Sequence, residues 1–344
     1  MVIDLRENHT QLKELIQEEL GHKRHSDDEN YVLQFILDWI NDKESFYFHT
    51  SGSTGQRKSM ALSRSQLAYS AQVTLNYIDP NHHFTSSLLC INPRFIGGTM
   101  VIVRALLGRM QLHVQQASSL PSINSAVDLI SMVPLQVNSL INGNLQKFQK
   151  INTLIIGGAA ISEKSISQLR AISSLSTYTS YGMTETASHI ALRNIKDNSG
   201  FQLLGDIQAT IIDDKLNLKG TATDHKKIVT NDIIKFITDD TFEFRGRIDH
   251  VINSGGYKIF PEEVESIMRP HFDFPFFIAG INDASLGEKV VLIAQTNNNI
   301  ELTEKIKMKL HRYQIPKDIF LVNQFEFTET EKINRKATLK KIGF

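Results

Sequence analysis

Hydrophobic and polar residues alternate along the chain with recognisable periods. Over residues 9–20 and 28–42 the hydrophobic side chains recur three and four positions apart, which predicts two amphipathic helices. A short apolar segment at residues 46–48 predicts a strand, and a polar Ser/Thr/Gly loop separates it from a helix expected at about residues 63–77. A strand, a phosphate-type loop and a helix, in that order, are how α/β proteins build sites for anions.

Strands and helices continue to alternate up to about residue 200. The pattern predicts two βα units centred on residues 87–92 and 100–104, a helix over residues 126–142, a buried strand at residues 153–156 and a helix at about residues 162–172. This alternation is typical of an α/β fold with layered sheets.

Beyond Gly200 the pattern changes to short alternating strands with hairpin turns, at residues 209–213, 228–230, 233–238 and 241–245. Strands at residues 251–253, 276–280 and 290–295, a helix opened by Pro261 and a helix at 303–312 then predict a small α+β unit. We therefore expect a large N-terminal α/β domain at residues 1–248, including a β-rich subdomain, and a small C-terminal domain at residues 249–344. The 344 residues exceed the roughly 100–200 residues of one typical domain.

Charge balance and cysteine count narrow the function. The 37 basic and 37 acidic side chains cancel, so no net field favours nucleic acid or an anionic membrane. Cys90 is the one cysteine, which rules out an internal disulfide and a multi-cysteine metal site. The first residues lack the layout of a signal peptide, and no apolar run approaches ~20 residues, so we expect a cytoplasmic protein without a membrane span.

Residues 50–58, Thr-Ser-Gly-Ser-Thr-Gly-Gln-Arg-Lys, carry the first candidate chemistry. Glycines let backbone N–H groups approach phosphate oxygens, hydroxyls add donors, and Lys58 supplies a point charge. A Walker A loop needs glycine, four residues and then Gly-Lys-Ser/Thr, and this loop fails that spacing because Arg57 stands where the second glycine belongs. A flexible Ser/Gly linker is the alternative reading of the loop on its own.

The loop resembles the phosphate loop of the adenylate-forming superfamily, which includes acyl-CoA synthetases, luciferases and the adenylation domains of peptide synthetases. Three further segments match that family in the same order. Tyr181-Gly182-Met183-Thr184-Glu185 matches its Tyr-Gly-x-Thr-Glu motif, residues 246–265 match its hinge motif, and residues 328–335 resemble its C-terminal lysine motif. Four ordered motifs over residues 50–335 make the resemblance specific.

The resemblance implies a binding site for ATP and AMP. The phosphate-binding residues would be Thr50, Ser51, Gly52, Ser53, Thr54, Gly55 and Lys58. The adenine pocket would be formed by Gly158, Ala159, Tyr181 and Gly182. Thr184 would contact phosphate, Glu185 would hold Mg²⁺, Asp232 would accept from the ribose hydroxyls and Arg247 would lie near the ribose or phosphate.

The resemblance also implies a moving domain and a second substrate, coenzyme A. Asp249 would be the hinge, and the pantetheine arm of CoA would pass Gly255, Gly256, Tyr257 and Lys258. Lys332 would be the catalytic lysine that binds the carboxylate and the α-phosphate. The sequence departs from the family here, with Glu326 and Glu331 where Pro and Gly are usual, and Lys336 or Lys340 stay open as alternatives.

The branch that it resembles most activates o-succinylbenzoate in menaquinone biosynthesis. The resembling residues are 92–100 and 181–190. Such an acid has a ring and two carboxylates, and we expect Arg94 and Ser188 to hold the second carboxylate, with Phe95 and Gly98 shaping the ring slot. The phosphate loop comes by residue 50, which implies an N-terminal domain shorter than is usual in the family.

Three alternatives remain open at this stage: a CoA ligase for another acid, a non-catalytic nucleotide-binding member of the family, and an adenylation domain that loads a carrier protein. The last is less favoured because no carrier domain follows before Phe344. The oligomeric state is also open, a homo-oligomer included.

Overall fold

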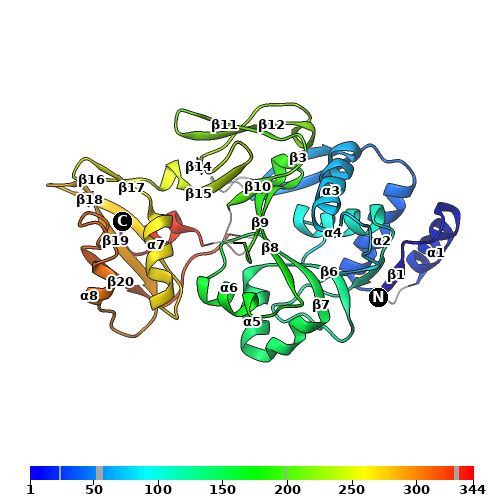
Figure 1. Cartoon of the computed structure of the whole chain (residues 1–344), viewed down its shortest axis with the longest axis horizontal. Coiled ribbons are helices and arrows are strands. Elements are labelled where there is room, and N and C mark those ends of the chain that lie inside the picture. Colours follow the sequence, from blue (N-terminus) through cyan, green and yellow to red (C-terminus); the bar gives the residue numbers. More distant parts are fainter. Residues whose placement is uncertain (23–24, 52–56, 198–199, 329–332) are drawn as a thin grey trace. The chain divides into compact units, whose positions relative to one another are not determined.

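A mixed sheet forms the centre of the first of two units (Figure 1). Its strands follow the order β1-β5-β4-β6-β7-β8-β9-β10. Their bounds are β1 (Val2–Asp4), β4 (Ser86–Leu89), β5 (Gln111–Val114), β6 (Val127–Met132), β7 (Ile151–Ile156), β8 (Ser176–Met183), β9 (Ser188–Asn194) and β10 (Phe201–Leu203). The pairs β5–β4, β4–β6, β6–β7 and β7–β8 are parallel, so these strands present their carboxyl ends at one edge.

The computed structural model describes residues 1–22, 25–51, 57–197, 200–328 and 333–344. The first unit comprises Met1–Ile161, Ser165–Ala209 and Leu218–Ile228, and the second comprises Ser162–Lys164, Thr210–Asn217 and Val229–Phe344. A domain boundary at residues 248 and 249 stays a prediction.

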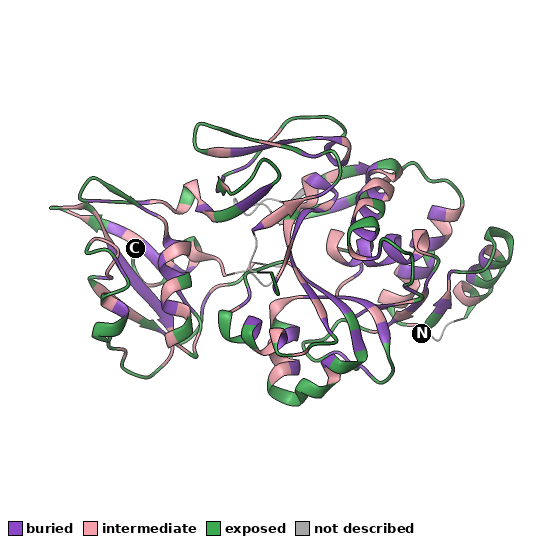
Figure 2. Cartoon of the chain, viewed as in Figure 1, coloured by how far each residue is buried: buried purple, intermediate pink, exposed green. Residues whose placement is uncertain are grey.

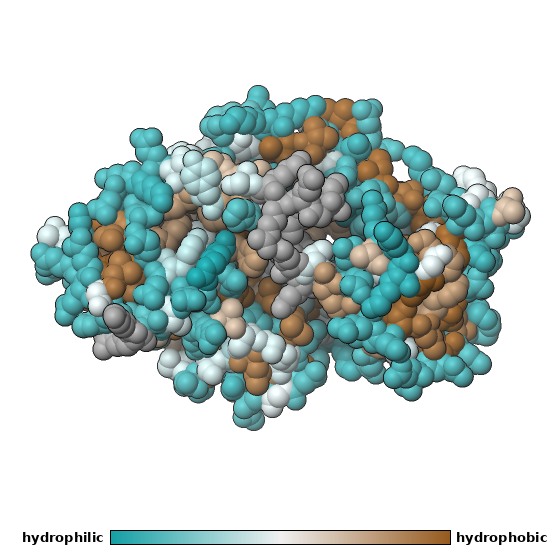
Figure 3. Space-filling model, turned by 180° about the vertical axis from the view of Figure 1, so that it is seen from behind, coloured by the Kyte–Doolittle hydropathy of each residue, from teal (hydrophilic) through white to brown (hydrophobic). Residues whose placement is uncertain are grey.

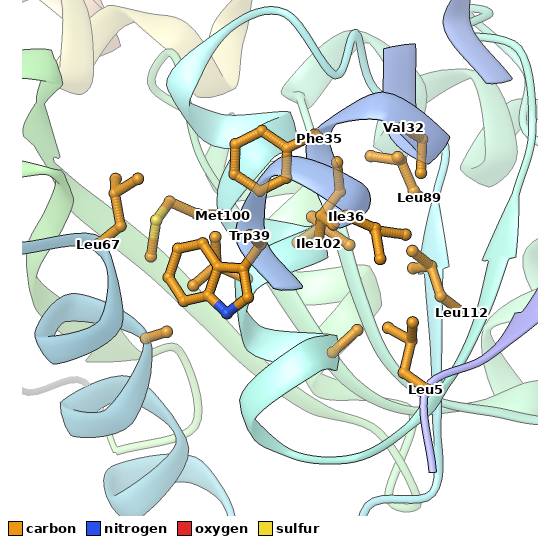
Figure 4. Close-up of a cluster of buried hydrophobic side chains, with 14 of the residues drawn as sticks. Leu5, Val32, Phe35, Ile36, Trp39, Leu67, Leu89, Met100, Ile102 and Leu112 are labelled. Carbon is orange, nitrogen blue, oxygen red and sulfur yellow. The ribbon is translucent and has the colours of Figure 1, made fainter. Parts of the chain in front are cut away.

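Helices cover the sheet of the first unit and supply most of its core. They are α1 (His9–Gly21), α2 (Asp27–Ile40), α3 (Arg64–Ile78), α4 (Ile96–Leu107), α5 (Pro134–Asn144) and α6 (Glu163–Arg170). Ser26 and Ser63 begin α2 and α3 as N-caps with full capping boxes. Figure 4 shows Phe35, Ile36 and Trp39 of α2 meeting side chains of α3, α4, β4 and β5, and Figure 2 shows the central strands largely buried.

Two paired strands flank the loop that is expected to bind phosphate. Strand β2 (Ser45–Ser51) pairs antiparallel with β3 (Arg57–Ser63), with Thr50 opposite Lys58. The sequence predicted strand, loop and helix, but the chain first returns as β3 and only then enters α3.

The second unit holds a separate sheet with the order β17-β16-β19-β18, and β20 pairs with β19. Its elements are β16 (Ile252–Ser254), β17 (Tyr257–Ile259), α7 (Pro261–Met268), β18 (Phe276–Asp283), β19 (Gly287–Gln295), α8 (Glu304–Lys307), β20 (Asp318–Val322) and α9 (Arg335–Lys341). The unit also includes the hairpin of β14 (Asp232–Phe236) and β15 (Thr241–Arg247). Strands β11 (Gln208–Ile212), β12 (Lys215–Lys219) and β13 (Ile228–Val229) form a small sheet of their own.

Three expected elements were wrong. Residues 126–142 do not form one helix, because the apolar run becomes β6 and Pro134 then begins α5 at its first turn. Residues 100–104 lie inside α4 and are not a strand, since tertiary packing on all sides overrides the β preference of Val101, Ile102 and Val103. The helix expected at 303–312 is limited to α8.

The face of the molecule in Figure 3 is mainly polar. On the face in Figure 3, hydrophobic residues appear as separate patches among hydrophilic ones. Among the described residues, no helix is both long and apolar enough to cross a membrane.

Candidate active site

The motif from Tyr181 to Glu185 lies where β8 ends and turns into β9. The pairing of β8 with β9 contains a bulge between Tyr181 and Gly182. A Cβ on Gly182 would stand 2.2 Å from the Ser188 carbonyl oxygen and 2.4 Å from the His189 Cα, so no other residue fits between these backbones. The glycine of the motif is therefore a packing requirement of the bulge.

A tight turn connects the two strands and fixes the motif's polar residues. Residues Thr184–Thr186 form one turn of 3₁₀ helix, and Ala187 and Ser188 both have positive φ. The buried Thr186 hydroxyl accepts from Met183 N at 3.1 Å and lies 2.7 Å from the Ser188 carbonyl oxygen. This places Thr184 and Glu185 half-buried at the carboxyl end of β8.

The glycine-rich turn after β7 lies beside this motif. Parallel pairing sets Ile156 opposite Thr179, so Gly158 and Ala159 follow their strand at the level where β8 reaches Tyr181. Gly158 has φ +88°, and both residues are exposed. The structure thus brings the predicted adenine-pocket residues to neighbouring strand ends, the usual place for ligands in parallel sheets.

Two other predicted groups lie outside the residues and side chains that the structure describes. Gly52, Ser53, Thr54 and Gly55 lie outside the described residues, as do the side chains of Thr50, Ser51 and Lys58. Lys332 also lies outside them. Their roles stay predictions.

The residues expected at the ribose converge in the second unit. Asp232 and Arg247 are opposite each other on β14 and β15, and Arg247 Nη1 lies 3.3 Å from Asp232 Oδ1. Arg247 also holds Asp249 with two hydrogen bonds of 2.9 and 3.1 Å. Burial alone would raise the pKa of Asp249, but these bonds and the charge of Arg247 hold it below its usual value. Asp232 is 7% exposed.

The segment expected to line the path of CoA is the turn between β16 and β17. Gly255 and Gly256 have φ +56° and +81°, as a tight hairpin turn with two left-handed residues requires. Tyr257 is half exposed and stacks on Tyr313 with ring centroids 4.4 Å apart. Lys258 Nζ lies 3.2 Å from Asp214 on the surface.

Arg94 lies on the surface and is engaged by the protein itself. Its guanidinium pairs with the Asp28 carboxylate, donates to the Asp27 carbonyl at 3.0 Å and lies 5.1 Å from the centroid of the Tyr31 ring. The next residue, Phe95, is the N-cap of α4 and is half buried. A Cβ on Gly98 would stand 2.1 Å from the Asn92 carbonyl oxygen, so this glycine allows α4 to approach the preceding turn.

Sequence reasoning did not single out Arg104, which lies within α4. Arg104 is 2% exposed, and its Nη2 donates to Ser131 Oγ at 3.2 Å. Its Nε and Nη1 have no hydrogen-bond partner, and no carboxylate pairs with it, in the part of the chain that the structure describes. Burial lowers the pKa of Arg104 to about 10, which still leaves the guanidinium charged at neutral pH. The available signal was one cation inside the apolar run of residues 100–107.

His189, which follows Ser188 at the start of β9, lies in the field of Arg104. Burial first, and then the positive charge of Arg104, lower the pKa of His189 to about 3. Its Nε2 lies 2.8 Å from the Thr74 hydroxyl. Because α3, α4 and β9 pack together, Thr74, Arg104 and His189 form a buried polar cluster beside the start of β9.

The described residues contain no group of three or more His, Cys, Asp or Glu side chains placed to hold a metal. Mg²⁺ usually takes one or two protein carboxylates and completes its shell with phosphate oxygens and water. A single half-buried carboxylate such as Glu185 would therefore fit that ion if nucleotide phosphates supplied further ligands.

Residues 7–223 match the family model of the AMP-binding enzymes. The chain belongs to that family. The predicted resemblance to adenylate-forming enzymes is thus confirmed, and with it a place among acid–CoA ligases that form acyl adenylates.

Individual AMP-binding enzymes resemble the chain over most of its length. A 2-succinylbenzoate–CoA ligase of Staphylococcus epidermidis is 26% identical, over 83% of this chain and 68% of that protein. An acyl-CoA synthetase (AMP-forming)/AMP-acid ligase II-like protein from Dyadobacter fermentans is 28% identical, with a TM-score of 0.63 over 96% of this chain and 98% of that one.

A third relative shares the fold at lower identity. The o-succinylbenzoate coenzyme A synthetase of Bacillus subtilis, solved with ATP and a magnesium ion, gives a TM-score of 0.76 at 17% identity over 98% of this chain and 83% of that one. These neighbours confirm the predicted α/β fold class.

Proposed function

We propose that the chain converts o-succinylbenzoate to o-succinylbenzoyl-CoA, a step of menaquinone biosynthesis, using ATP. One carboxylate oxygen of the acid attacks the α-phosphorus of ATP, the bond to the β-phosphate oxygen breaks, and acyl-AMP and pyrophosphate form. The thiol sulfur of CoA then attacks the acyl carbon, AMP leaves with the electrons of the C–O bond, and the thiol proton passes to solvent. The 2-succinylbenzoate–CoA ligase of Staphylococcus epidermidis supports this choice of acid.

The observation that carries the choice of acid is Arg104. A buried guanidinium with two free donor groups is costly unless an anion completes it. A dicarboxylic acid brings that anion, because one carboxylate reacts while the other remains charged. Arg104 is therefore a better candidate for the second carboxylate than Arg94, whose guanidinium already has Asp28 and the Tyr31 ring.

The other acid-pocket residues keep their proposed roles around Arg104. Ser188 precedes His189 and would add a hydroxyl to the grip on the second carboxylate. Phe95 and Gly98 stand at the first turn of α4, the helix that carries Arg104, and would shape the slot for the ring.

The nucleotide would bind across the strand ends of the first unit. Tyr181 and Gly182, with Gly158 and Ala159, would hold adenine, and the loop at residues 50–58 would hold the phosphates. Thr184 would donate to phosphate. When bound, Mg²⁺ on Glu185 would offset the charge of the phosphates.

The second unit would bring the remaining groups. Asp232 would accept from the ribose hydroxyls, Arg247 would lie near the ribose or phosphate, and Asp249 would be the hinge of a mobile C-terminal domain. Lys332 would offset charge on the reacting carboxylate and α-phosphate, which is electrostatic stabilisation of the transition state. The turn of Gly255 and Gly256, with Tyr257 and Lys258, would guide the arm of CoA. The proposed place of action is the cytoplasm.

The proposal is tested with the purified chain, ATP, Mg²⁺ and CoA against a panel of acids. Pyrophosphate release and mass spectrometry of the thioester are measured for o-succinylbenzoate, benzoate, succinate, a fatty acid and several amino acids. We expect kcat/KM to be highest for o-succinylbenzoate and its thioester to accumulate. Turnover of another acid in preference to it would refute the choice of substrate, and nucleotide binding without turnover of any acid would refute the enzyme.

A further inference from the structure

The residues on either side of the segment that carries the candidate lysine are joined to each other in the second unit. Phe327 and Ile333 form an antiparallel bridge, and Asn334 N donates to the Glu326 carbonyl at 2.7 Å. Asn334 then caps α9, since its side-chain oxygen accepts from Ala337 N at 3.1 Å. Lys332 is bonded directly to Ile333 in the sequence. Contacts that fix the start of α9 therefore also limit where the lysine can reach.

Arg335, the first residue of α9, connects the start of this helix to helix α7. Its Nη1 and Nη2 lie 2.9 and 3.0 Å from the two oxygens of Glu265. Nη1 also donates to the Ile278 carbonyl at 3.2 Å, and the guanidinium lies 5.5 Å from the centroid of the Phe277 ring. A two-point contact of this kind sets the direction of the side chain as well as its distance.

The partner of Arg335 is deeply buried. Glu265 is 4% exposed, and its Oε1 accepts from Ile278 N at 2.8 Å. Burial raises the pKa of Glu265, although the charge of Arg335 opposes the rise. The carboxylate cannot turn toward water without leaving these donors, so it provides a fixed anchor.

The contacts continue to the segment expected to be the hinge. Glu262, on α7, lies 3.5 Å from Arg335 Nη2 and 2.5 Å from His250 Nδ1. His250 follows Asp249 directly. Glu262 also packs closely on Gly246, because a Cβ on Gly246 would stand 2.6 Å from Glu262 Oε2. One connected set of contacts thus joins the start of α9 to the segment that carries Arg247 and Asp249.

We propose that Arg335 is a positioning residue for adenylation, which fixes the start of α9, next to Lys332 in the sequence, against α7 and couples it to the hinge segment through Glu262 and His250. The proposal rests on the proposed function and on Lys332 as the lysine of adenylation. Arg335 acts through geometry, since its own guanidinium is used by Glu265, Glu262 and Ile278. Its loss should slow the step that needs Lys332 and leave the transfer of the acyl group to CoA intact.

The test separates the two half-reactions. Acyl-adenylate formation is followed by pyrophosphate release without CoA, and thioester formation is followed from supplied acyl-AMP and CoA. Removing Arg335 alone would leave the buried Glu265 with only the more distant Arg269 Nη2, at 3.7 Å. The informative variant is therefore the double change Arg335→Met with Glu265→Met, whose fold is checked by circular dichroism and thermal unfolding.

We expect the double variant to fold, to lose about 10- to 100-fold in kcat for adenylation with little change in the KM for ATP, and to keep the thioester step within about threefold. Lys332→Ala should give the same signature. Arg335→Lys should recover part of the loss, because a single-point cation can still reach Glu265 but cannot hold both of its oxygens. The matched control is Lys341→Met, in the same helix as Arg335. This change breaks an exposed ion pair with Glu326 and should leave both half-reactions unchanged.

Two results would overturn the proposal: adenylation within twofold of wild type in the folded double variant, or an equal fall in both half-reactions. Failure of the proposed function would look different, because the wild-type chain itself would then form no acyl adenylate from o-succinylbenzoate.

Discussion

The hydroxyl of Thr74 and the imidazole of His189 meet at 2.8 Å in the core of the first unit. The Thr74 hydroxyl also donates to the Ser70 carbonyl at 2.8 Å, and it has only one proton. Both contacts are hydrogen bonds only if His189 Nε2 is the donor. The lowered pKa of His189 beside the charge of Arg104 keeps the ring neutral at neutral pH, so its single proton is on Nε2 and its lone pair is on Nδ1.

The first prediction concerns stability at mildly acid pH. The pKa of His189 falls from 6.5 to about 3 on folding, so between these values the unfolded chain binds a proton that the folded chain does not. The contribution of His189 is fully present above about pH 6.5 and is lost as pH falls toward 3, at up to about 1.4 kcal/mol per pH unit. The free energy of unfolding by urea, measured from pH 7.5 down to 4.5, should therefore depend less on pH in His189→Gln than in wild type. Parallel curves would contradict the neutral, buried state of His189.

The second prediction sets activity against stability at Arg104. Arg104→Met removes a buried charge that no described carboxylate compensates, so the free energy of unfolding should rise by about 1 kcal/mol or more. The same change should lower kcat/KM for o-succinylbenzoate by about 100-fold, because the second carboxylate loses its partner. Urea unfolding and initial rates of pyrophosphate release measure the two effects. A loss of stability together with unchanged kcat/KM would mean that Arg104 is structural.

The third prediction concerns Arg94 and provides the comparison for Arg104. Arg94 is exposed and pairs with Asp28 at the surface, a kind of pair that contributes about 0 to 1 kcal/mol. Arg94→Met should therefore change the free energy of unfolding by less than about 1 kcal/mol and kcat/KM for o-succinylbenzoate by less than about threefold. A loss as large as that of Arg104→Met would restore Arg94 as the residue that holds the second carboxylate.

The contrast between these two arginines shows where sequence reasoning reached its limit. Helices α1, α2 and α3 follow from the pattern because each buries one face at a regular spacing. Helix α4 buries residues on all sides, so its sequence has no period to detect, and an arginine within it does not stand out as a candidate. Arg94 was proposed because it lies within residues 92–100, a segment that carries the resemblance, and its role stays a prediction.

The convergence of Asp232 and Arg247 shows a second limit. The two residues stand opposite each other because β14 pairs with β15 in a register that includes a bulge after Ile233. Their motifs predicted a shared nucleotide site, but nothing in their spacing predicted a direct contact between the two side chains. Register depends on packing over whole strands, which local patterns do not specify.

The fourth prediction concerns the glycine of the Tyr181–Glu185 motif. A Cβ at Gly182 would collide with backbone atoms of Ser188 and His189, which belong to paired strands and cannot move independently. Gly182→Ala should therefore lower the free energy of unfolding by about 3 kcal/mol or more, and the folded remainder should lose adenylation because the turn bearing Thr184 and Glu185 shifts. Gly97→Ala is the matched control, since its Cβ would meet only Ile91 Cδ1 at 3.7 Å inside helix α4, where alanine stabilises by about 0.5–1 kcal/mol. Urea unfolding of the two variants, with pyrophosphate release for each, distinguishes a bulge that demands glycine from one that merely contains it: equal behaviour of the two variants would remove the bulge as the reason for Gly182.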